Sequence, residues 1–166
     1  MNSFEIEEIK VAPIGIIRTP HSDIAGMPIQ PSAAEGIRGY IELFCEYKDG
    51  LKDLEGFSHA TLVYRFHRVR GYNLHVTPFM DTEQRGIFAT RAPKRPNAIG
   101  ISTVKIIGIR DTVIEIEQVD MLDGTPLLDI KPFYSKYDNR IDAVCGWLDL
   151  QTDMTAERMR SDERFR

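Results

Sequence analysis

Hydrophobic and polar residues alternate with a period of two along several short stretches of the chain, the pattern of half-buried β-strands. In the clearest stretch, Ser58–His67, the side chains of Leu62, Tyr64 and Phe66 share one face. Shorter stretches of similar character predict further strands over Val11–Arg18, Tyr40–Phe44, Leu74–Thr77, Gly86–Thr90, Ile101–Arg110, Thr112–Glu117 and Leu127–Ile130.

The predicted strands follow one another closely, and no long helical pattern separates them. Ile101–Arg110 and Val113–Glu117, joined through Asp111 and Thr112, predict a hairpin. The pattern of Tyr47–Leu54 predicts at most a short helical turn. The residues from 154 onward are weakly amphipathic and compatible with a helix, and they could form a loose tail. This order favours a mainly β protein with an antiparallel sheet, as a barrel or a sandwich, over a doubly wound fold.

One long segment, Thr19–Gly36, shows the hydrophobic period of neither a strand nor a helix. It contains three prolines and two glycines. A structureless stretch of this length inside a small domain is usually functional or disordered.

Length and composition are those of one ordinary globular domain: 166 residues, 42% of them hydrophobic and 28% charged. No apolar run is long enough to span a membrane, and the first residues, MNSFEIEEIK, lack the apolar core of a signal peptide. We therefore expect a cytoplasmic enzyme or binding protein without a membrane partner. Cys45 and Cys145 form no CxxC pair, so we expect reduced thiols in the core.

The net charge of −4 conceals a strongly uneven distribution. Residues 61–110 carry nine Lys and Arg against two Asp and Glu, whereas the segments on both sides are acidic. A basic middle third predicts a localised anion site. Ion pairs between these cations and acidic residues elsewhere in the fold are an equally good explanation.

Several common site patterns are absent from the sequence. It contains no GxGxxG, GxxxxGK[ST] or GxSxG motif, and its four histidines show neither HExxH nor Cys/His spacing. A nucleotide-like ligand would therefore bind to a scaffold other than a Rossmann or P-loop fold, and we expect no metal site.

The basic loop lies in Arg85–Gly100, RGIFATRAPKRPNAIG, where two prolines alternate with Arg91, Lys94 and Arg95. Because proline fixes the backbone, these cations are held in place, which suits capture of a phosphate or carboxylate. The alternative is a rigid surface connection with solvated cations.

Two further segments carry candidate chemistry. In Asp120–Phe133, DMLDGTPLLDIKPF, acidic side chains surround a strong turn signal and could bind ribose hydroxyls or an ammonium group, although spacing alone favours a simple turn. His67 ends a strand beside Arg68 and Arg70, where its ring could contact a base, although a structural histidine is the commoner case.

These motifs occur in a specific order along the chain. The sequence contains LKDLEGFSH at Leu51–His59, FH at Phe66–His67, RGIFATRAPKRPNAIG and LDGTPLLDIKPF, preceded by PIGIIRTP at Pro13–Pro20 and PIQP at Pro28–Pro31. Together they resemble the TrmO family (also called TsaA or YaeB-like) of S-adenosylmethionine-dependent tRNA methyltransferases. The resemblance covers roughly residues 11–135.

The resemblance implies a single antiparallel β-barrel over residues 1–135, followed by a C-terminal extension over residues 136–166. It implies a homodimer with the S-adenosylmethionine pocket near the subunit interface. The implied reaction is methyl transfer to the exocyclic amino nitrogen of threonylcarbamoyl-adenosine, next to the tRNA anticodon. A non-catalytic β-barrel that binds a nucleotide or RNA is the competing interpretation.

Carried over by motif, the cofactor contacts would come from Gln30, Pro31, Ser32, His67, Arg68, Arg91, Ile101, Asp120, Met121, Leu122 and Asp123. We expect tRNA phosphates to meet the basic residues Arg65, Arg70, Lys94 and Arg95. Asp129 and Lys131 are our candidates for orienting the base or accepting its proton. Binding of one cofactor by these motifs requires Arg91 and Asp123 to converge on a single pocket.

The chain departs from the family pattern at two of these sites. Ile29 stands where the family usually has arginine, which removes one candidate phosphate or carboxylate contact. Ala98 stands where the family usually has proline, which relaxes the basic loop.

Overall fold

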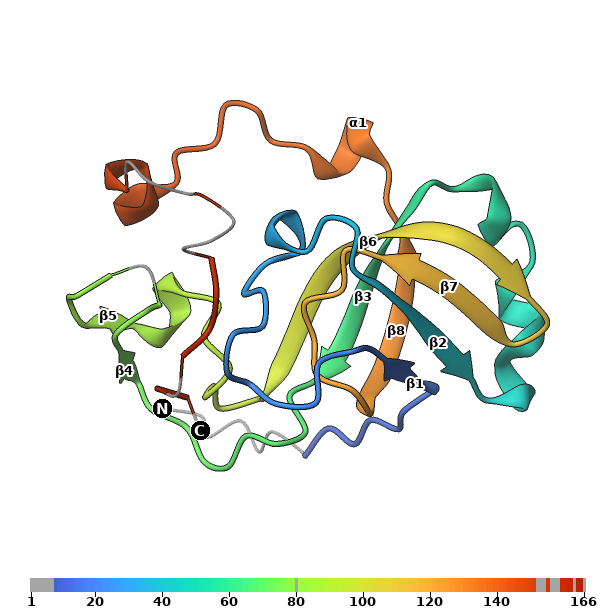
Figure 1. Cartoon of the computed structure of the whole chain (residues 1–166), viewed down its shortest axis with the longest axis horizontal. Coiled ribbons are helices and arrows are strands. Elements are labelled where there is room, and N and C mark those ends of the chain that lie inside the picture. The colour runs from blue at the N-terminus through green and yellow to red at the C-terminus, as the bar shows by residue number, and fades with distance from the viewer. Residues whose placement is uncertain (1–7, 80, 152–154, 156–158, 163, 166) are drawn as a thin grey trace, which may run out of the picture.

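The computed structural model describes residues 8–79, 81–151, 155, 159–162, 164 and 165 (Figure 1). Six strands close into a barrel in the order β1–β2–β7–β6–β3–β8, with antiparallel pairing throughout. They are β1 (Gly15–Arg18), β2 (Arg38–Leu43), β3 (His59–Arg65), β6 (Ile99–Arg110), β7 (Val113–Glu117) and β8 (Thr125–Pro132). The predicted mainly β fold and the barrel are confirmed.

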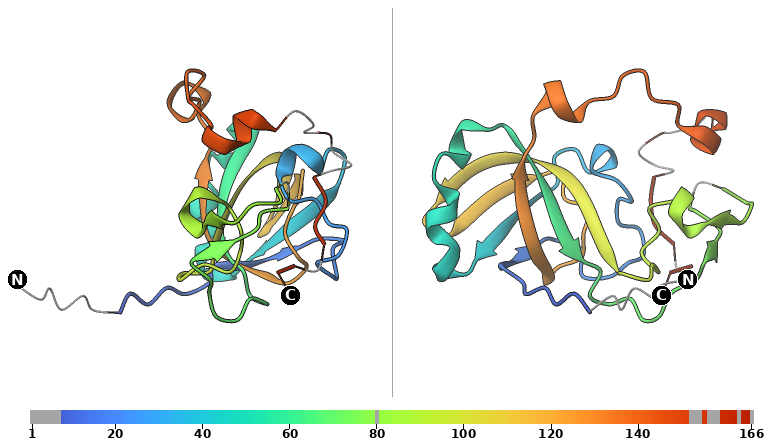
Figure 2. Two further views of the ribbon diagram at one scale, coloured as in Figure 1. Left: turned by 90° about the vertical axis from the view of Figure 1, so that its left-hand side faces the viewer. Right: turned by 180° about the vertical axis from the view of Figure 1, so that it is seen from behind.

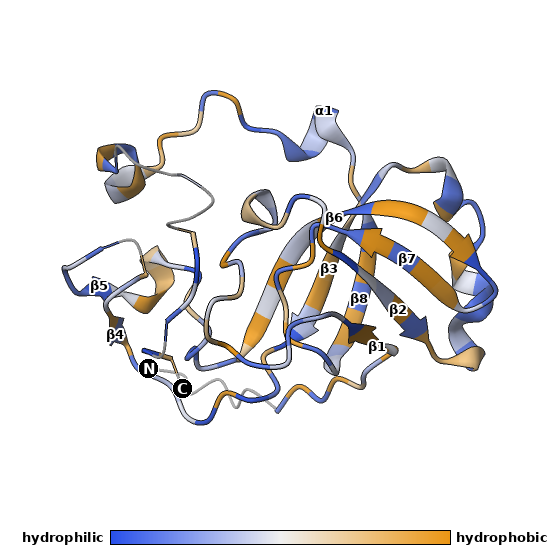
Figure 3. Ribbon diagram, viewed as in Figure 1, coloured by the Kyte–Doolittle hydropathy of each residue, from blue (hydrophilic) through white to orange (hydrophobic). Residues whose placement is uncertain are grey.

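The period-two pattern explains the barrel core. In β7, Ile114 and Ile116 are buried while their neighbours along the strand are exposed or half-exposed, and Figure 3 shows hydrophobic and hydrophilic residues interleaved along β2 and β7. The buried apolar side chains include Ile17, Ile41, Leu62, Val104, Ile114, Ile116, Val119 and Leu127. Their burial is the main contribution to the stability of the barrel.

The predicted hairpin of β6 and β7 is confirmed by the pairing of Arg110 with Val113. Asp111 in its turn has a positive φ of 57°, a conformation that aspartate tolerates better than most residues. β6 is long enough to pair with β3 over its first half and with β7 over its second, and a bulge near Gly108 bends it.

A small lobe beside the barrel is formed by β4 (His75–Val76), β5 (Arg85–Gly86) and the 3₁₀ turn η4 (Ile87–Ala89) (Figure 1). The prediction of a strand over Gly86–Thr90 is wrong beyond its first residue. The chain turns there because the Thr90 hydroxyl and the Arg95 guanidinium both donate to the carbonyl of Ile87.

Three further 3₁₀ turns lie in the connections: η1 (Pro31–Ala33), η2 (Cys45–Leu51) and η3 (Leu54–Gly56). The helical turn expected over Tyr47–Leu54 is therefore real but belongs to two short 3₁₀ elements. The long segment before β2 contains only η1 and an isolated bridge as regular structure.

The cysteines contradict one expectation. Both are free thiols, as predicted, but Cys45 and Cys145 are exposed rather than buried in the core. The reason is that Cys45 opens the surface turn η2 and Cys145 lies directly before η5 (Gly146–Leu150), outside the barrel.

After β8 the chain passes through α1 (Ser135–Asp138) and η5, arching away from the barrel before it returns to the lobe (Figure 2). In the helix-compatible pattern from residue 154 onward, residues 154, 156–158, 163 and 166 lie outside the described residues, and none of the described residues there is helical. Within the described part of the chain, no helix has the length and apolar character needed to cross a membrane.

Candidate functional site at one rim of the barrel

Strand direction gathers the predicted cofactor segments at one end of the barrel. Because neighbouring strands are antiparallel, the ends of β1, β3 and β7 lie with the starts of β2, β6 and β8. We call this end the site rim; it is marked by Arg18, Arg38, Arg65, Ile99, Glu117 and Thr125. The opposite end, the far rim, is marked by Gly15, Leu43, His59, Arg110, Val113 and Pro132.

A buried chain of polar side chains runs through the site rim. The Tyr64 hydroxyl lies 3.0 Å from Ser102 Oγ, which donates a hydrogen bond of 2.6 Å to Asp120 Oδ1. Tyr64 and Ser102 are 4% and 3% exposed. β3 and β6 bring the first two side chains into the barrel, and Asp120 follows β7.

The carboxyl of Asp120 is the most perturbed acid described in the site. Burial raises its pKa to about 6, although the hydrogen bond from Ser102 and the charge of Arg91 both act to lower it. The residue keeps some accessible surface, but its carboxyl group is largely withdrawn from water. A cationic ligand group beside it would favour the ionised form, so this position fits an ammonium or a sulfonium.

The turn between β7 and β8 is held by its own side chains. Gly124 adopts a positive φ of 76°, which a β-carbon would strain. Thr125 Oγ1 donates 2.7 Å to the Leu122 carbonyl and lies 3.3 Å from His67 Nδ1. Asp123 Oδ1 accepts the backbone N–H of Thr19 at 3.2 Å. Thr125 thereby links His67 to the turn that carries Leu122 and Asp123.

His67 is prepared to act as a neutral hydrogen-bonding group. Burial, and after it the charge of Arg68, lowers its pKa, so the ring is uncharged at neutral pH. Arg68 itself donates 2.9 Å to the carbonyl of Ser22, which ties the end of β3 to the loop after β1.

Gln30 and Arg91 meet at a second place on the site rim. Arg91 Nη1 donates to Gln30 Oε1 at 3.3 Å. Pro31 starts η1, and Ser32 is exposed. The pairing unites two segments that the sequence separates widely, and the charge of Arg91 reaches both Asp120 and Tyr64.

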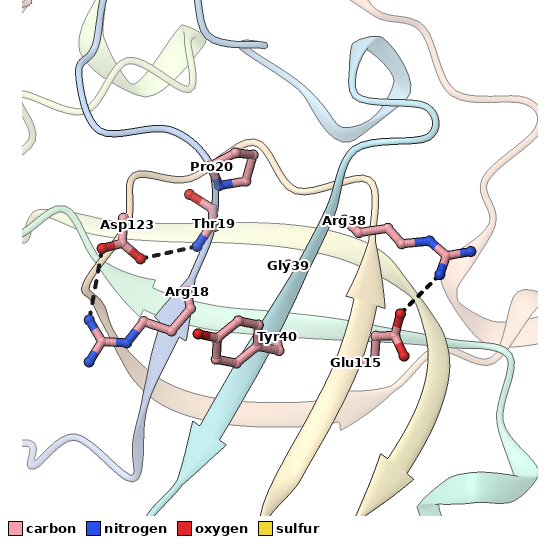
Figure 4. Close-up of a pocket in the computed structure, with 8 residues that line it drawn as sticks. All are labelled: Arg18, Thr19, Pro20, Arg38, Gly39, Tyr40, Glu115 and Asp123. Atoms are coloured by element: carbon pink, nitrogen blue, oxygen red, sulfur yellow. Dashed lines mark hydrogen bonds and ion pairs between the residues drawn. The ribbon is translucent and has the colours of Figure 1, made fainter.

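An open hollow of about 480 Å³ lies at the site rim, next to β1 and β2 (Figure 4). Asp123 borders it and faces the Arg18 guanidinium, with 3.8 Å between Oδ2 and Nη1. Its lining is Arg18, Thr19, Pro20, Arg38, Gly39, Tyr40, Glu115 and Asp123. Arg91 is not part of this lining, so the convergence of Arg91 and Asp123 on a single pocket remains a prediction.

Ile101 occupies the outer surface of the barrel. It is 52% exposed, and its neighbours Gly100 and Ser102 are buried. Its side chain therefore points away from the Tyr64–Ser102–Asp120 chain.

The predicted RNA-contacting residues are not equivalent. Arg65 and Arg70 are exposed, and Lys94 is half-buried with an interaction of its own. Arg95 Nη1 donates to the carbonyls of Ile87 and Thr90 at 3.1 and 2.8 Å. Arg95 is thus engaged in holding the lobe together.

Asp129 and Lys131 lie away from the site rim. They are about 13 and 20 Å farther along β8 than Thr125, given the rise of a strand per residue. They form an exposed ion pair of 2.7 Å, and Asp129 borders a different hollow of about 510 Å³ near η2 and η3. Within one chain, the catalytic role assigned to them is not supported by their position.

At both departures from the family pattern, Ile29 and Ala98, the backbone of the residue makes a hydrogen bond to another segment. The N–H of Ile29 donates 3.1 Å to Met159, and the carbonyl of Ala98 accepts 2.8 Å from Phe66. Both segments keep a defined course despite the substitutions.

Sequence reasoning missed Ser102, Tyr64 and Thr125 as site residues. Ser102 was recognisable only as a polar residue at an inward position of an apolar strand, and the strand register was needed to see it. Among the described residues, no cluster of three His, Cys, Asp or Glu side chains is arranged to hold a metal.

Fold and site together define a class: a closed antiparallel barrel whose loops at one rim present a buried carboxylate, a neutral imidazole and an arginine–glutamine pair. The profile of the tRNA-methyltransferase O N-terminal domain matches residues 16–139. The chain belongs to the TrmO family.

Three relatives illustrate the similarity. A probable S-adenosyl-L-methionine-binding protein of Pyrococcus abyssi is 48% identical, covering 92% of this chain and 83% of the relative. The tRNA (adenine(37)-N6)-methyltransferase of Escherichia coli is 34% identical, and the match covers 89% of this chain and 65% of that protein. The crystal structure of TrmO from Pseudomonas aeruginosa superposes with a TM-score of 0.72 at 36% identity, covering 84% of this chain and 62% of that one. The chain is thus shorter than the two bacterial proteins.

Proposed function

We propose that the protein is an S-adenosylmethionine-dependent methyltransferase that modifies an adenine of tRNA. The single observation that carries this proposal is the match of the family profile over the whole barrel. The relatives named for S-adenosylmethionine binding and for tRNA adenine N6-methylation support the cofactor and the reaction.

The residues present fit this cofactor chemically. S-adenosylmethionine, when bound, supplies an activated methyl group on a sulfonium, together with an ammonium and a carboxylate. Asp120 offers a buried negative charge for a cation, and Arg91 a guanidinium for a carboxylate. The half-buried Leu122 adds apolar surface next to Asp123, whereas Met121 is 3% exposed and packs in the barrel core.

In this proposal the chain acts mainly by orientation. The Tyr64–Ser102 pair fixes the carboxylate of Asp120, and Thr125 fixes the ring of His67. Holding the acceptor nitrogen in line with the methyl group accounts for much of the rate increase expected of such an enzyme. Because His67 is neutral, its free ring nitrogen is available to hydrogen-bond the substrate.

The acceptor we propose is the exocyclic nitrogen of threonylcarbamoyl-adenosine next to the anticodon, in a cytoplasmic tRNA. The exposed Arg65 and Arg70 are suited to the phosphates around it, which would set the register of the RNA.

We also propose a homodimer with the site near its interface. Ile99 and Ile101 are 43% and 52% exposed on the outer face of β6, at the site rim. In this proposal a second subunit forms the other wall of the pocket that the outward-facing Ile101 lines.

A binding protein without turnover is the second candidate, because one of the most similar relatives is named only for S-adenosylmethionine binding. One experiment separates the two. The protein is incubated with methyl-labelled S-adenosylmethionine and tRNA from cells that possess or lack the threonylcarbamoyl modification.

Label in the modified tRNA alone supports the full proposal. Label in both tRNA pools supports a methyltransferase with a different acceptor. Cofactor binding without any transfer supports the binding protein, and absence of both removes the proposal.

A further inference from the structure

The described residues near the C-terminus form a buried segment outside the matched family profile, which ends at residue 139. Met159, Ser161 and Phe165 are 6%, 8% and 6% exposed, although they follow an arm whose side chains are largely exposed. Figure 1 shows the segment running between the lobe and the loop that follows β1. The burial of these three side chains indicates that the segment has a structural role.

The first half of the segment pairs with the loop that leads to Gln30. The N–H of Ser161 donates 2.9 Å to Met27, and the carbonyl of Ser161 accepts 2.9 Å from Gly26. The N–H of Ile29 donates 3.1 Å to Met159, directly before Gln30. The Ser161 hydroxyl also bonds the Met27 carbonyl at 3.1 Å. This short antiparallel pairing fixes the backbone on which Gln30 sits.

The second half of the segment inserts into the lobe. Phe165 packs with Val76, Ile87 and Ala92, and its ring meets Phe79 edge-on at 4.9 Å. Arg164 Nη1 donates 2.6 Å to the carbonyl of Pro78, and its guanidinium lies 5.5 Å from the centre of the Phe79 ring. Ala92 is the direct neighbour of Arg91, so this cluster fixes the backbone that carries the arginine.

Gln30 and Arg91 both lie outside the barrel strands, Gln30 between β1 and η1 and Arg91 between η4 and β6. Their mutual hydrogen bond is long, at 3.3 Å, and exposed, so it contributes little by itself. Holding both groups in place before a ligand arrives reduces the entropy that binding must overcome.

We infer that residues 159–162, 164 and 165 are a clasp whose Ser161 and Phe165 position Gln30 and Arg91 for the cofactor. The inference rests on the proposed function, because it assigns these two side chains to S-adenosylmethionine. The clasp residues are positioning residues: they join the two loops that carry Gln30 and Arg91, and their described hydrogen bonds and apolar contacts lie in those loops and the lobe, not on the barrel wall with Asp120.

The test uses the full chain with two substitutions, one in each half of the clasp. Ser161→Pro removes the N–H that donates to Met27, and Phe165→Ala empties the lobe cluster. Phe165→Leu keeps the apolar volume as the conservative variant. Ile141→Ser changes a side chain of the same C-terminal arm that is 99% exposed and serves as the matched control.

We expect each disruptive variant to weaken S-adenosylmethionine binding in calorimetry about tenfold, which corresponds to about 1.4 kcal/mol. The Michaelis constant for the cofactor should rise while kcat at saturation changes less than about twofold. Phe165→Leu should recover most of the affinity, and Ile141→Ser should match the wild type. In Ser161→Pro, the amides of Gly26 and Ile29 should exchange hydrogen faster.

The outcomes separate the clasp from the proposed function. Wild-type protein that does not bind S-adenosylmethionine overturns the function, whatever the variants do. Wild-type protein that binds, together with folded Ser161→Pro and Phe165→Ala proteins of unchanged affinity, overturns the clasp. A fall in kcat with an unchanged Michaelis constant also overturns it.

Discussion

Two aspartates that the motifs singled out lie in opposite surroundings, one at the site rim and one farther along β8. At the site rim, Asp120 is enclosed, accepts a hydrogen bond of 2.6 Å from Ser102 and has a pKa raised to about 6. Near the far rim, the half-exposed Asp129 pairs with an exposed lysine. An exposed pair of this kind contributes at most about 1 kcal/mol and needs no functional explanation.

The comparison shows that environment, rather than motif membership, separates a functional carboxylate from an ordinary one. Both aspartates belong to a single stretch of sequence, Asp120–Phe133. A strand that begins at Thr125 carries the second of them about 13 Å along the barrel wall, to a position paired with Val63. Four predictions test this contrast and others like it.

The largest difference should appear when each aspartate loses its charge. Asp120→Asn keeps the size of the side chain but removes the anion, and we expect methyl transfer to fall about 100-fold, since hydrogen bonds and contacts to a charged group contribute about 1.5–3 kcal/mol. Asp129→Asn, the matched substitution farther along β8, should change the rate less than about twofold. Initial rates at saturating tRNA measure both, and equal losses would remove the distinction between the two surroundings.

A second contrast lies along β6. A β-carbon on Gly100 would come within 2.4 Å of the Tyr64 ring and 2.8 Å of Phe66, whereas one on Gly108 meets nothing within 4 Å. We expect Gly100→Ala to lower the free energy of unfolding by about 2 kcal/mol and Gly108→Ala by less than about 0.5 kcal/mol. Urea unfolding followed by fluorescence provides the values. An undisturbed Gly100→Ala protein would mean that the Tyr64–Ser102–Asp120 chain is loosely packed.

The third contrast concerns pH. The pKa of Asp120 is raised in the folded state, so between about pH 4 and pH 7 the native protein binds more protons than the unfolded one, and this group destabilises the fold as pH rises. Asp120→Asn lacks the effect. Its stability relative to wild type should therefore increase by about 1–2 kcal/mol from pH 4 to pH 7, a value reduced for the residual exposure of the residue. Parallel urea unfolding at both pH values tests this, and a constant difference would contradict the burial of the carboxyl.

The smallest effect separates two arginines of the basic segment. Arg70 is exposed, whereas Arg95 donates to carbonyls of the lobe. Arg70→Ala should reduce the slope of log K against log salt for tRNA binding by about 0.7–0.9, the value for one phosphate contact. Arg95→Ala should instead lower the melting temperature and leave the slope closer to that of the wild type. A loss of slope only in Arg95→Ala would return Arg95 to the phosphate contacts.

Much of the fold could be read from the sequence because it depends on local alternation. The strand Ser58–His67 and the hairpin at Asp111 are examples in which period and turn chemistry agree. The turn at Asp123–Gly124 also followed from its local sequence.

The rest depends on register and on contacts between distant segments. The inward position of Ser102 requires the pairing of β6 with β3, and the internal bonds of Arg95 require the turn η4. The strand predicted over Gly86–Thr90 failed because side-chain bonds to a carbonyl outweigh a short β-branched pattern. Pairing of Ser161 with Met27 joins residues more than a hundred positions apart, which no local pattern indicates.

The most direct test of the account is a titration of the full chain with S-adenosylmethionine, followed by amide chemical shifts in ¹⁵N-labelled protein. We predict that the shifts concentrate at the site rim, at Gln30, His67, Ser102 and Asp120–Asp123, while Asp129 and Lys131 stay unchanged. Shifts centred on Asp129 and the hollow near η2, with the site rim silent, would contradict the placement of the site.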